Sequence, residues 1–143
     1  NNAGVAPQVP IGETDATLMR ETLDRNLVGP TILVTTAWPE LVRRRGRVVN
    51  ISWMASIDPS QGFTAYAASK SGLDSLTRSI MAEAGETGVT AFTLNPGIVE
   101  TPLLRSLFDE TVVPAGAALE PGQVADEIAA CLRGEDPAKL RWE

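Results

Sequence analysis

Apolar side chains recur at helical spacing in four stretches of the chain and fill two short runs between them. Helices are predicted over residues 13–25, 31–44, 64–84 and 122–133. Two β-branched, apolar runs are predicted as strands that are buried on both faces, residues 47–52 and 89–94, with residues 140–142 a candidate for one more. Glycine and proline mark the connections, with a break at residues 26–30, a loop at 53–63 and an irregular stretch at 95–120.

Helix, strand, helix, strand, helix is the order typical of a parallel sheet with helices on both faces, a doubly wound α/β fold. Two or three parallel strands are too few to bury such apolar helices and would leave an open edge. We therefore expect further strands before Asn1. The opening Asn-Asn-Ala-Gly is interpreted as the turn that leaves the carboxyl end of such a strand.

Charge and composition exclude several classes of partner. The 143 residues include 12 basic and 18 acidic side chains, for a net charge of −6, so no sequence-independent binding to nucleic acid or to an anionic membrane is expected. No apolar run approaches the length of a membrane span, and the start does not have the pattern of a signal peptide. A cytoplasmic location is the expectation.

The reactive residue types are scarce. The chain has no histidine, which excludes Ser-His-Asp and Cys-His catalysis and histidine metal sites. A single cysteine, Cys131, excludes an internal disulfide and a cysteine-cluster zinc site, so no metal site is expected. Acid–base chemistry near neutral pH then falls to a carboxylate, a tyrosine, a lysine or Cys131.

The one tyrosine, Tyr66, stands four residues before Lys70, one of only two lysines. That spacing places both side chains on one face of a helix. A free phenol has a pKa near 10 and exchanges protons poorly at pH 7 unless a cation favours the phenolate. Lysine supplies such a cation and, unlike arginine, can also release a proton. Taken alone, the motif is weak, and a tyrosine that packs on a lysine stem is the better interpretation.

Further motifs accompany this pair in a fixed order. They are Asn2-Ala3-Gly4, Asn26, the run 46–52, Tyr66-Ala67-Ala68-Ser69-Lys70, and the run 95–102 that starts Asn95-Pro96-Gly97. This ordered set resembles the classical short-chain dehydrogenases/reductases, over residues 1 to about 102. The resemblance implies a Rossmann-like sheet, NAD or NADP as cofactor, and an alcohol or carbonyl compound as small-molecule substrate. It makes residues 1–143 the catalytic, C-terminal part of one cofactor-binding domain.

The resemblance also implies roles for individual residues. Tyr66 would exchange a proton with the substrate oxygen, Lys70 would lower the pKa of Tyr66 and hold the ribose hydroxyls, and Asn26 would hold a water that links Lys70 to solvent. The residues implied to bind the cofactor are Asn2, Ala3, Gly4, Tyr66, Lys70, Pro96, Gly97, Val99 and Thr101. A homodimer or homotetramer through the two long helices is implied as well.

Two features depart from the family pattern. The glycine-rich pyrophosphate loop is absent from the sequence, as is the residue that selects NAD or NADP, so the choice of cofactor stays open. Position 53, thirteen residues before Tyr66, is tryptophan where the family has a serine that binds the substrate oxygen. Three interpretations are open: a one-residue slip that brings in Ser52, reduced or lost activity, and an error in the sequence. Lost activity would suit a structural or regulatory subunit.

Overall fold

The computed structural model describes residues 1–58 and 60–135. The chain divides into two compact units, Asn1–Asn95 and a second that begins at Pro96, and each is described by itself. The first unit contains, in order, a 3₁₀ turn at Ile11–Glu13, α1 (Ala16–Leu23), a π-helical turn at Asp24–Val28, α2 (Gly29–Arg44), β1 (Arg47–Ile51), a 3₁₀ turn at Met54–Ser56, α3 (Thr64–Ala84), a 3₁₀ turn at Gly85–Thr87 and β2 (Thr90–Leu94).

The first helical segment differs from the sequence prediction at one point. The Asp15 side chain caps α1 by accepting a hydrogen bond from the Leu18 N–H at 2.8 Å. The break predicted at residues 26–30 is wrong, because a π-helical turn joins α1 to α2 without interruption. Its hydrogen bonds run five residues back, as from the Gly29 N–H to the Asp24 carbonyl, so the helix accommodates Pro30, which has no N–H to donate.

The two predicted strands are confirmed and pair in parallel, in register from Arg47 with Thr90 to Ile51 with Leu94. Both therefore end at the same edge of the sheet. The other side of β1 pairs with the first residue of the chain, through hydrogen bonds of 2.7 Å from the Asn1 amino group to the Val49 carbonyl and 2.9 Å from the Ile51 N–H to the Asn1 carbonyl. The opening residue thus lies beside β1 as the end of a neighbouring strand would.

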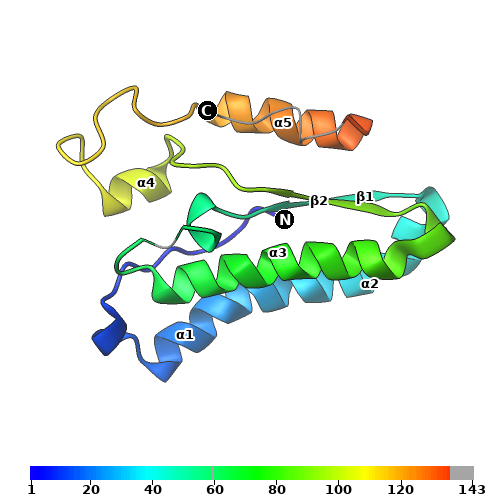
Figure 1. Cartoon of the computed structure of the whole chain (residues 1–143), viewed down its shortest axis with the longest axis horizontal. Helices are drawn as coiled ribbons and strands as arrows, with labels where there is room; N and C mark the ends of the chain where they lie inside the picture. The colour runs from blue at the N-terminus through cyan, green and yellow to red at the C-terminus, as the bar shows by residue number, and fades with distance from the viewer. Residues whose placement is uncertain (59, 136–143) are drawn as a thin grey trace. The chain divides into compact units, whose positions relative to one another are not determined.

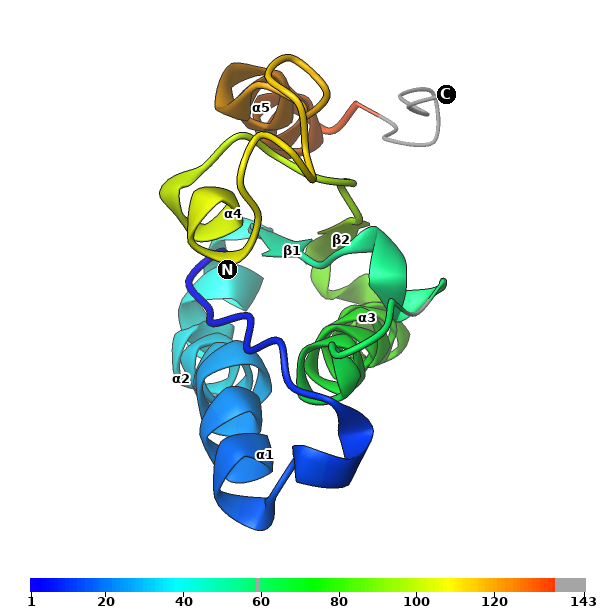
Figure 2. The same ribbon diagram turned by 90° about the vertical axis from the view of Figure 1, so that its left-hand side faces the viewer.

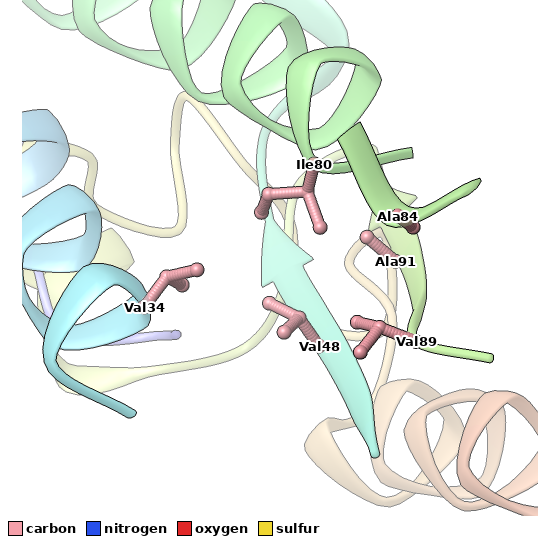
Figure 3. Close-up of a cluster of buried hydrophobic side chains, with 6 residues drawn as sticks. All are labelled: Val34, Val48, Ile80, Ala84, Val89 and Ala91. Atoms are coloured by element: carbon pink, nitrogen blue, oxygen red, sulfur yellow. The ribbon is translucent and has the colours of Figure 1, made fainter. Parts of the chain in front are cut away.

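Helices α2 and α3 lie side by side against one face of this sheet (Figures 1 and 2). The core between them and the strands consists of six buried side chains, shown in Figure 3: Val34, Val48, Ile80, Ala84, Val89 and Ala91. Val48 and Ala91 are directly opposite each other in the sheet, so both point to the helical face. The helical spacing of apolar residues, which predicted these helices, reflects the face that each helix buries against the sheet.

The second unit contains α4 (Pro102–Leu107) and α5 (Pro121–Arg133). The helix predicted at 122–133 is confirmed as α5, while α4 lies in a stretch that was predicted to be irregular. Thr101 caps α4 by accepting a hydrogen bond from the Leu104 N–H at 3.2 Å. A strand predicted at residues 140–142 lies outside the described residues. Among the described residues, no helix is both long and apolar enough to span a membrane.

Candidate active site

Tyr66 and Lys70 stand one turn apart at the start of α3, as their spacing predicted. The Lys70 Nζ atom lies 5.5 Å from the centre of the Tyr66 ring. The same Nζ donates a 2.7 Å hydrogen bond to the carbonyl of Ile51, the last residue of β1. This contact places the pair at the edge of the sheet where the parallel strands end, which is where ligands bind in open α/β folds.

Burial favours the neutral forms of the Lys70 amine and the Tyr66 phenol. Only 4% of Lys70 is exposed, and desolvation lowers its pKa to about 8, against a smaller opposing effect of the Asp74 carboxylate. Burial also raises the pKa of the Tyr66 phenol to about 12. Desolvation of the phenolate is the cause of this rise, and the expectation that Lys70 lowers the pKa of Tyr66 stays a prediction.

Trp53, at the position where the resemblance leads us to expect a serine, packs directly on Tyr66. The two ring centres are 5.0 Å apart at an interplanar angle of 41°, and Phe63 closes the cluster at 5.1 Å from Trp53. The neighbouring Ser52 points elsewhere, since its hydroxyl donates a 3.2 Å hydrogen bond to the backbone carbonyl of Lys70. The slip that would bring Ser52 to Tyr66 is thus not present.

Asn26 lies in the π-helical turn and is almost fully buried. Its side chain accepts a hydrogen bond from the Val5 N–H and donates to the Val5 carbonyl, each at 2.8 Å, and donates to the Ser69 hydroxyl at 2.9 Å. Both amide hydrogens of Asn26 are therefore used within the protein. Gly4 makes the contact possible, because a Cβ there would lie 2.8 Å from the Asn26 Oδ1 atom.

The remaining predicted cofactor residues divide between the two units. Asn2, Ala3 and Gly4 are exposed in the first unit, directly after the residue that pairs with β1. In the second unit, Pro96 and Gly97 follow the end of β2. Val99 forms a bridge with Leu119, and the Thr101 hydroxyl donates to the Val99 carbonyl at 3.2 Å.

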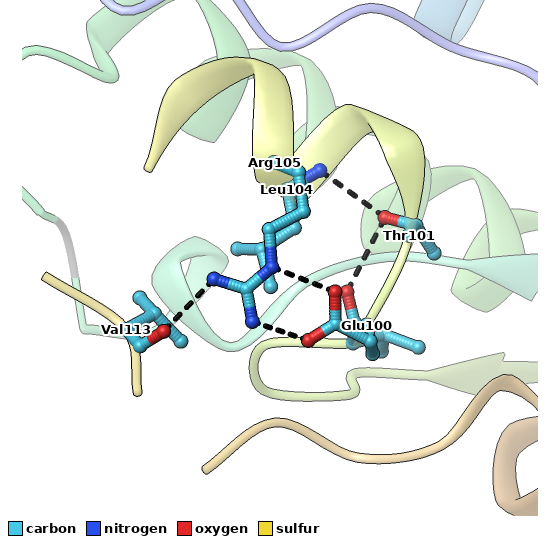
Figure 4. A network of polar contacts seen from close by, with 6 residues as sticks. Glu100, Thr101, Leu104, Arg105 and Val113 are labelled. Carbon is cyan, nitrogen blue, oxygen red and sulfur yellow. Dashed lines mark hydrogen bonds and ion pairs between the residues drawn. The ribbon is translucent and has the colours of Figure 1, made fainter. Parts of the chain in front are cut away.

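The start of α4 is held by an ion pair within the second unit (Figure 4). The Arg105 guanidinium binds both carboxylate oxygens of Glu100, with Nε 2.7 Å from Oε1, and it also donates to the Val113 carbonyl at 2.8 Å. The ion pair raises the pKa of Arg105 and lowers that of Glu100. These contacts order the segment around Thr101.

Sequence reasoning missed a polar cluster formed by Ser56, Asp74 and Asn95. The Ser56 hydroxyl donates to Asp74 Oδ2 at 2.7 Å, and the Asn95 amide donates to the same oxygen at 3.2 Å and to Ser56 Oγ at 3.0 Å. The spacing of Asp74, four residues after Lys70, is the only sequence signal for this cluster, because Ser56 and Asn95 lie in separate connections. Within the part of the chain that the structure describes, no three or more His, Cys, Asp or Glu side chains form a group that could hold a metal ion.

Fold and site together define an α/β protein with a tyrosine–lysine pair where its parallel strands end. Residues 1–111 match the family model described as short chain dehydrogenase, and the chain belongs to that family. It is 35% identical over 130 residues to an L-fucose dehydrogenase of Oryctolagus cuniculus, covering 90% of this chain and 45% of that protein. It is 35% identical over 107 residues to an L-xylulose reductase of Caenorhabditis elegans, covering 73% and 43%.

Solved structures agree with this assignment. A short chain dehydrogenase/reductase family protein superposes with a TM-score of 0.83 at 33% identity, covering 92% of this chain and 57% of that one. A putative NAD(P)-dependent gluconate 5-dehydrogenase from Beutenbergia cavernae, with bound NADP, superposes with a TM-score of 0.82 at 29% identity, covering 90% and 55%. The two strands and their helices are therefore part of a Rossmann fold, and the chain spans about half the length of the curated relatives it matches.

Proposed function

We propose that the protein is an NAD(P)-dependent oxidoreductase that interconverts an alcohol and a carbonyl compound, with Tyr66 as the acid–base group. The observation that carries the proposal is the pairing of Tyr66 with Lys70 at the carboxyl end of β1. Membership of the short chain dehydrogenase family supports it. NAD and NADP remain equal candidates, because the described contacts include none that would select between them.

The residues present fit the nicotinamide and ribose part of such a cofactor. The Lys70 ammonium has three N–H donors and uses one on Ile51, so two remain for ribose hydroxyls. Asn2, Ala3 and Gly4 are exposed and would bind the cofactor as well. Pro96, Gly97, Val99 and Thr101 would hold the nicotinamide end. A bound nicotinamide supplies a hydride to the carbonyl carbon or accepts one from the alcohol carbon.

Residues of the chain would donate the proton to the substrate oxygen or accept it from there. In carbonyl reduction, the Tyr66 hydroxyl donates its proton to the substrate oxygen, and in alcohol oxidation the phenolate accepts it. Lys70 favours the phenolate through its charge, and the backbone of Asn26 would hold the water that connects Lys70 to solvent. A phenol pKa of about 12 keeps Tyr66 protonated at neutral pH, which suits donation.

A second function is favoured by Trp53. The indole fills the place of the serine that would bind the substrate oxygen, and it lies against the Tyr66 ring. A chain with this substitution would keep the fold and serve as a structural or regulatory subunit of reduced or no activity. The two proposals differ in turnover and in cofactor binding.

The proposed function includes an oligomeric state and a location in the cell. A homodimer or homotetramer through α2 and α3 is supported by a surface hollow of about 300 Å³ between these helices, lined by Trp38 and Leu76 among others. On α2, Ile32 and Leu33 are each 60% exposed, which is unusual for large apolar side chains. A cytoplasmic location is part of the proposal.

Cofactor titration and a turnover assay test these proposals on the full-length protein. NADH and NADPH binding is followed by nicotinamide fluorescence, and turnover is measured on a panel of alcohols and carbonyls that includes L-fucose and L-xylulose, after the names of the two relatives. We expect binding with turnover, and loss of turnover with retained binding in Tyr66→Phe. Absence of binding would overturn the enzyme proposal, and binding without turnover would favour the subunit.

A further inference from the structure

We propose that Asp74 is a positioning residue for the candidate active site, and that its carboxylate clamps the Trp53 turn and the end of β2 to helix α3. This inference rests on the proposed function, since it assigns Asp74 a part in ordering that same site. The carboxylate lies on α3 one turn beyond Lys70. It therefore belongs to the helix that carries Tyr66 and Lys70, while its hydrogen-bond partners come from two other segments.

The first contact holds the turn that carries Trp53. Asp74 Oδ2 accepts a 2.7 Å hydrogen bond from the Ser56 hydroxyl, and the Ser71 hydroxyl donates to the Ser56 carbonyl at 3.1 Å. The Ser56 N–H in turn donates to the Trp53 carbonyl at 2.9 Å. The position of the Trp53 ring against Tyr66 thus depends on a turn that α3 holds from two of its own residues.

The second contact holds the end of β2. The Asn95 amide lies 3.4 and 3.2 Å from the two Asp74 carboxylate oxygens and 3.0 Å from Ser56 Oγ. Asn95 directly precedes Pro96 and Gly97, which the proposed function places at the nicotinamide end. One carboxylate therefore orders the start of that segment as well as the Trp53 turn.

A carboxylate suits this role because it only accepts hydrogen bonds, and the hydroxyl and amide that face it can both donate. Bonds to a charged acceptor are also stronger than bonds between neutral groups. The charge acts on Lys70 too, since Asp74 opposes the lowering of the Lys70 pKa. The other groups that face Lys70 are Tyr66 on α3 and the Ile51 carbonyl on β1.

Asp74→Asn tests the clamp in the full-length protein, because the amide keeps the size of the side chain but brings N–H donors toward Asn95. The Lys70 signal is assigned as the one that Lys70→Arg removes. We expect the Asp74→Asn variant to lower the Lys70 pKa by about 0.5 unit or more, measured by NMR titration of its side chain. We also expect the Trp53 resonance to shift in protein that carries 5-fluorotryptophan, with Trp53→Phe assigning the signal.

Ser56→Ala separates the two effects of Asp74. It removes one donor and keeps the carboxylate, so we expect it to shift the Trp53 resonance and to leave the Lys70 pKa unchanged. Asp74→Glu keeps the charge and is expected to restore the Lys70 pKa. Glu86→Gln removes an exposed carboxylate just past the end of α3 and is the control that should change neither signal.

The kinetic readout is separate from the spectroscopic one. If the protein turns over substrate, we expect Asp74→Asn to reduce kcat about 10-fold while the cofactor Kd changes less than about 2-fold, and Asp74→Glu to recover part of the loss. Unchanged Trp53 and Lys70 signals in Asp74→Asn would overturn the clamp. An inactive parent protein in which both signals still move would support the clamp and contradict the enzyme proposal alone.

Discussion

The indole of Trp53 lies 5.0 Å, centre to centre, from the phenol ring of Tyr66, in the position where the family pattern has a serine. Aromatic rings in this arrangement stabilise each other and exclude water from the space between them. The contact accounts for part of the burial that raises the Tyr66 pKa to about 12. Under the proposed function, this indole stands in place of the serine that would bind the substrate oxygen.

Replacing the indole with a hydroxyl should restore the substrate contact. We expect Trp53→Ser to raise turnover about 10-fold or more, since one donor to a reacting oxygen is worth that factor or greater in other enzymes. The measurement is steady-state kinetics of the full-length protein on its best substrate. Trp53→Ala is the matched control, because it opens the same space without adding a donor. Equal turnover in the wild type and the serine variant would contradict the idea that Trp53 blocks the site.

The buried lysine should make stability depend on pH. The pKa of Lys70 is about 8 in the fold and near 10.5 when exposed, so between these values the unfolded chain binds more protons than the folded one. The free energy of unfolding should therefore rise with pH across this window, by roughly 3 kcal/mol at most. Urea titrations between about pH 7.5 and 9.5 would measure it, below the range in which the raised Tyr66 pKa acts with the opposite sign.

Lys70→Met provides the comparison for that measurement, because methionine fills a similar volume without a titrating group. The variant should lose the rise in stability over the same pH range. An identical slope in both proteins would mean that the group responsible is not Lys70.

The close approach of Gly4 to Asn26 should make position 4 intolerant of a side chain. A Cβ at Gly4 would lie 2.8 Å from the Asn26 Oδ1 atom, and that amide is fixed by three hydrogen bonds. We expect Gly4→Ala to destabilise the protein by about 1–3 kcal/mol in urea unfolding. Gly12→Ala is the control, because a Cβ there would have no atom within 4 Å. Equal loss in both variants would point to a general effect of removing glycine.

The Arg105 side chain should hold the segment that follows α4. Arg105→Met removes the bonds to Glu100 and to the Val113 carbonyl, so we expect amide hydrogen exchange in residues 108–113 to accelerate about 3-fold or more. Arg133→Met breaks an exposed ion pair with Glu135 and should leave that exchange unchanged. Glu100→Gln should have a smaller effect than Arg105→Met, because the bond to Val113 remains. An equal effect in Glu100→Gln would show that the ion pair alone orders the segment.

Several helices and strands could be predicted from the sequence, because the spacing of apolar residues that indicates them is a local property. The spacing of apolar residues predicted α3 and α5 and both strands within a few residues, since a helix or strand that buries one side must repeat at its own period. The same reasoning missed the continuous path from α1 to α2, because proline and glycine signal a break while a π-helical turn absorbs them. It assigned residues 95–120 to an irregular stretch, because α4 has only six residues and too few turns to show a period.

By itself, the sequence determined which residues are available for chemistry: one tyrosine, a lysine one turn later, and no histidine. Only the tertiary structure decided the environment of those residues. It attached the Lys70 ammonium to Ile51, stacked Trp53 on Tyr66, and brought Asp74, Ser56 and Asn95 together. The physical reason is that spacing along a helix is a local property, whereas burial, and the pKa and hydrogen bonds that depend on it, arise from segments distant in the chain.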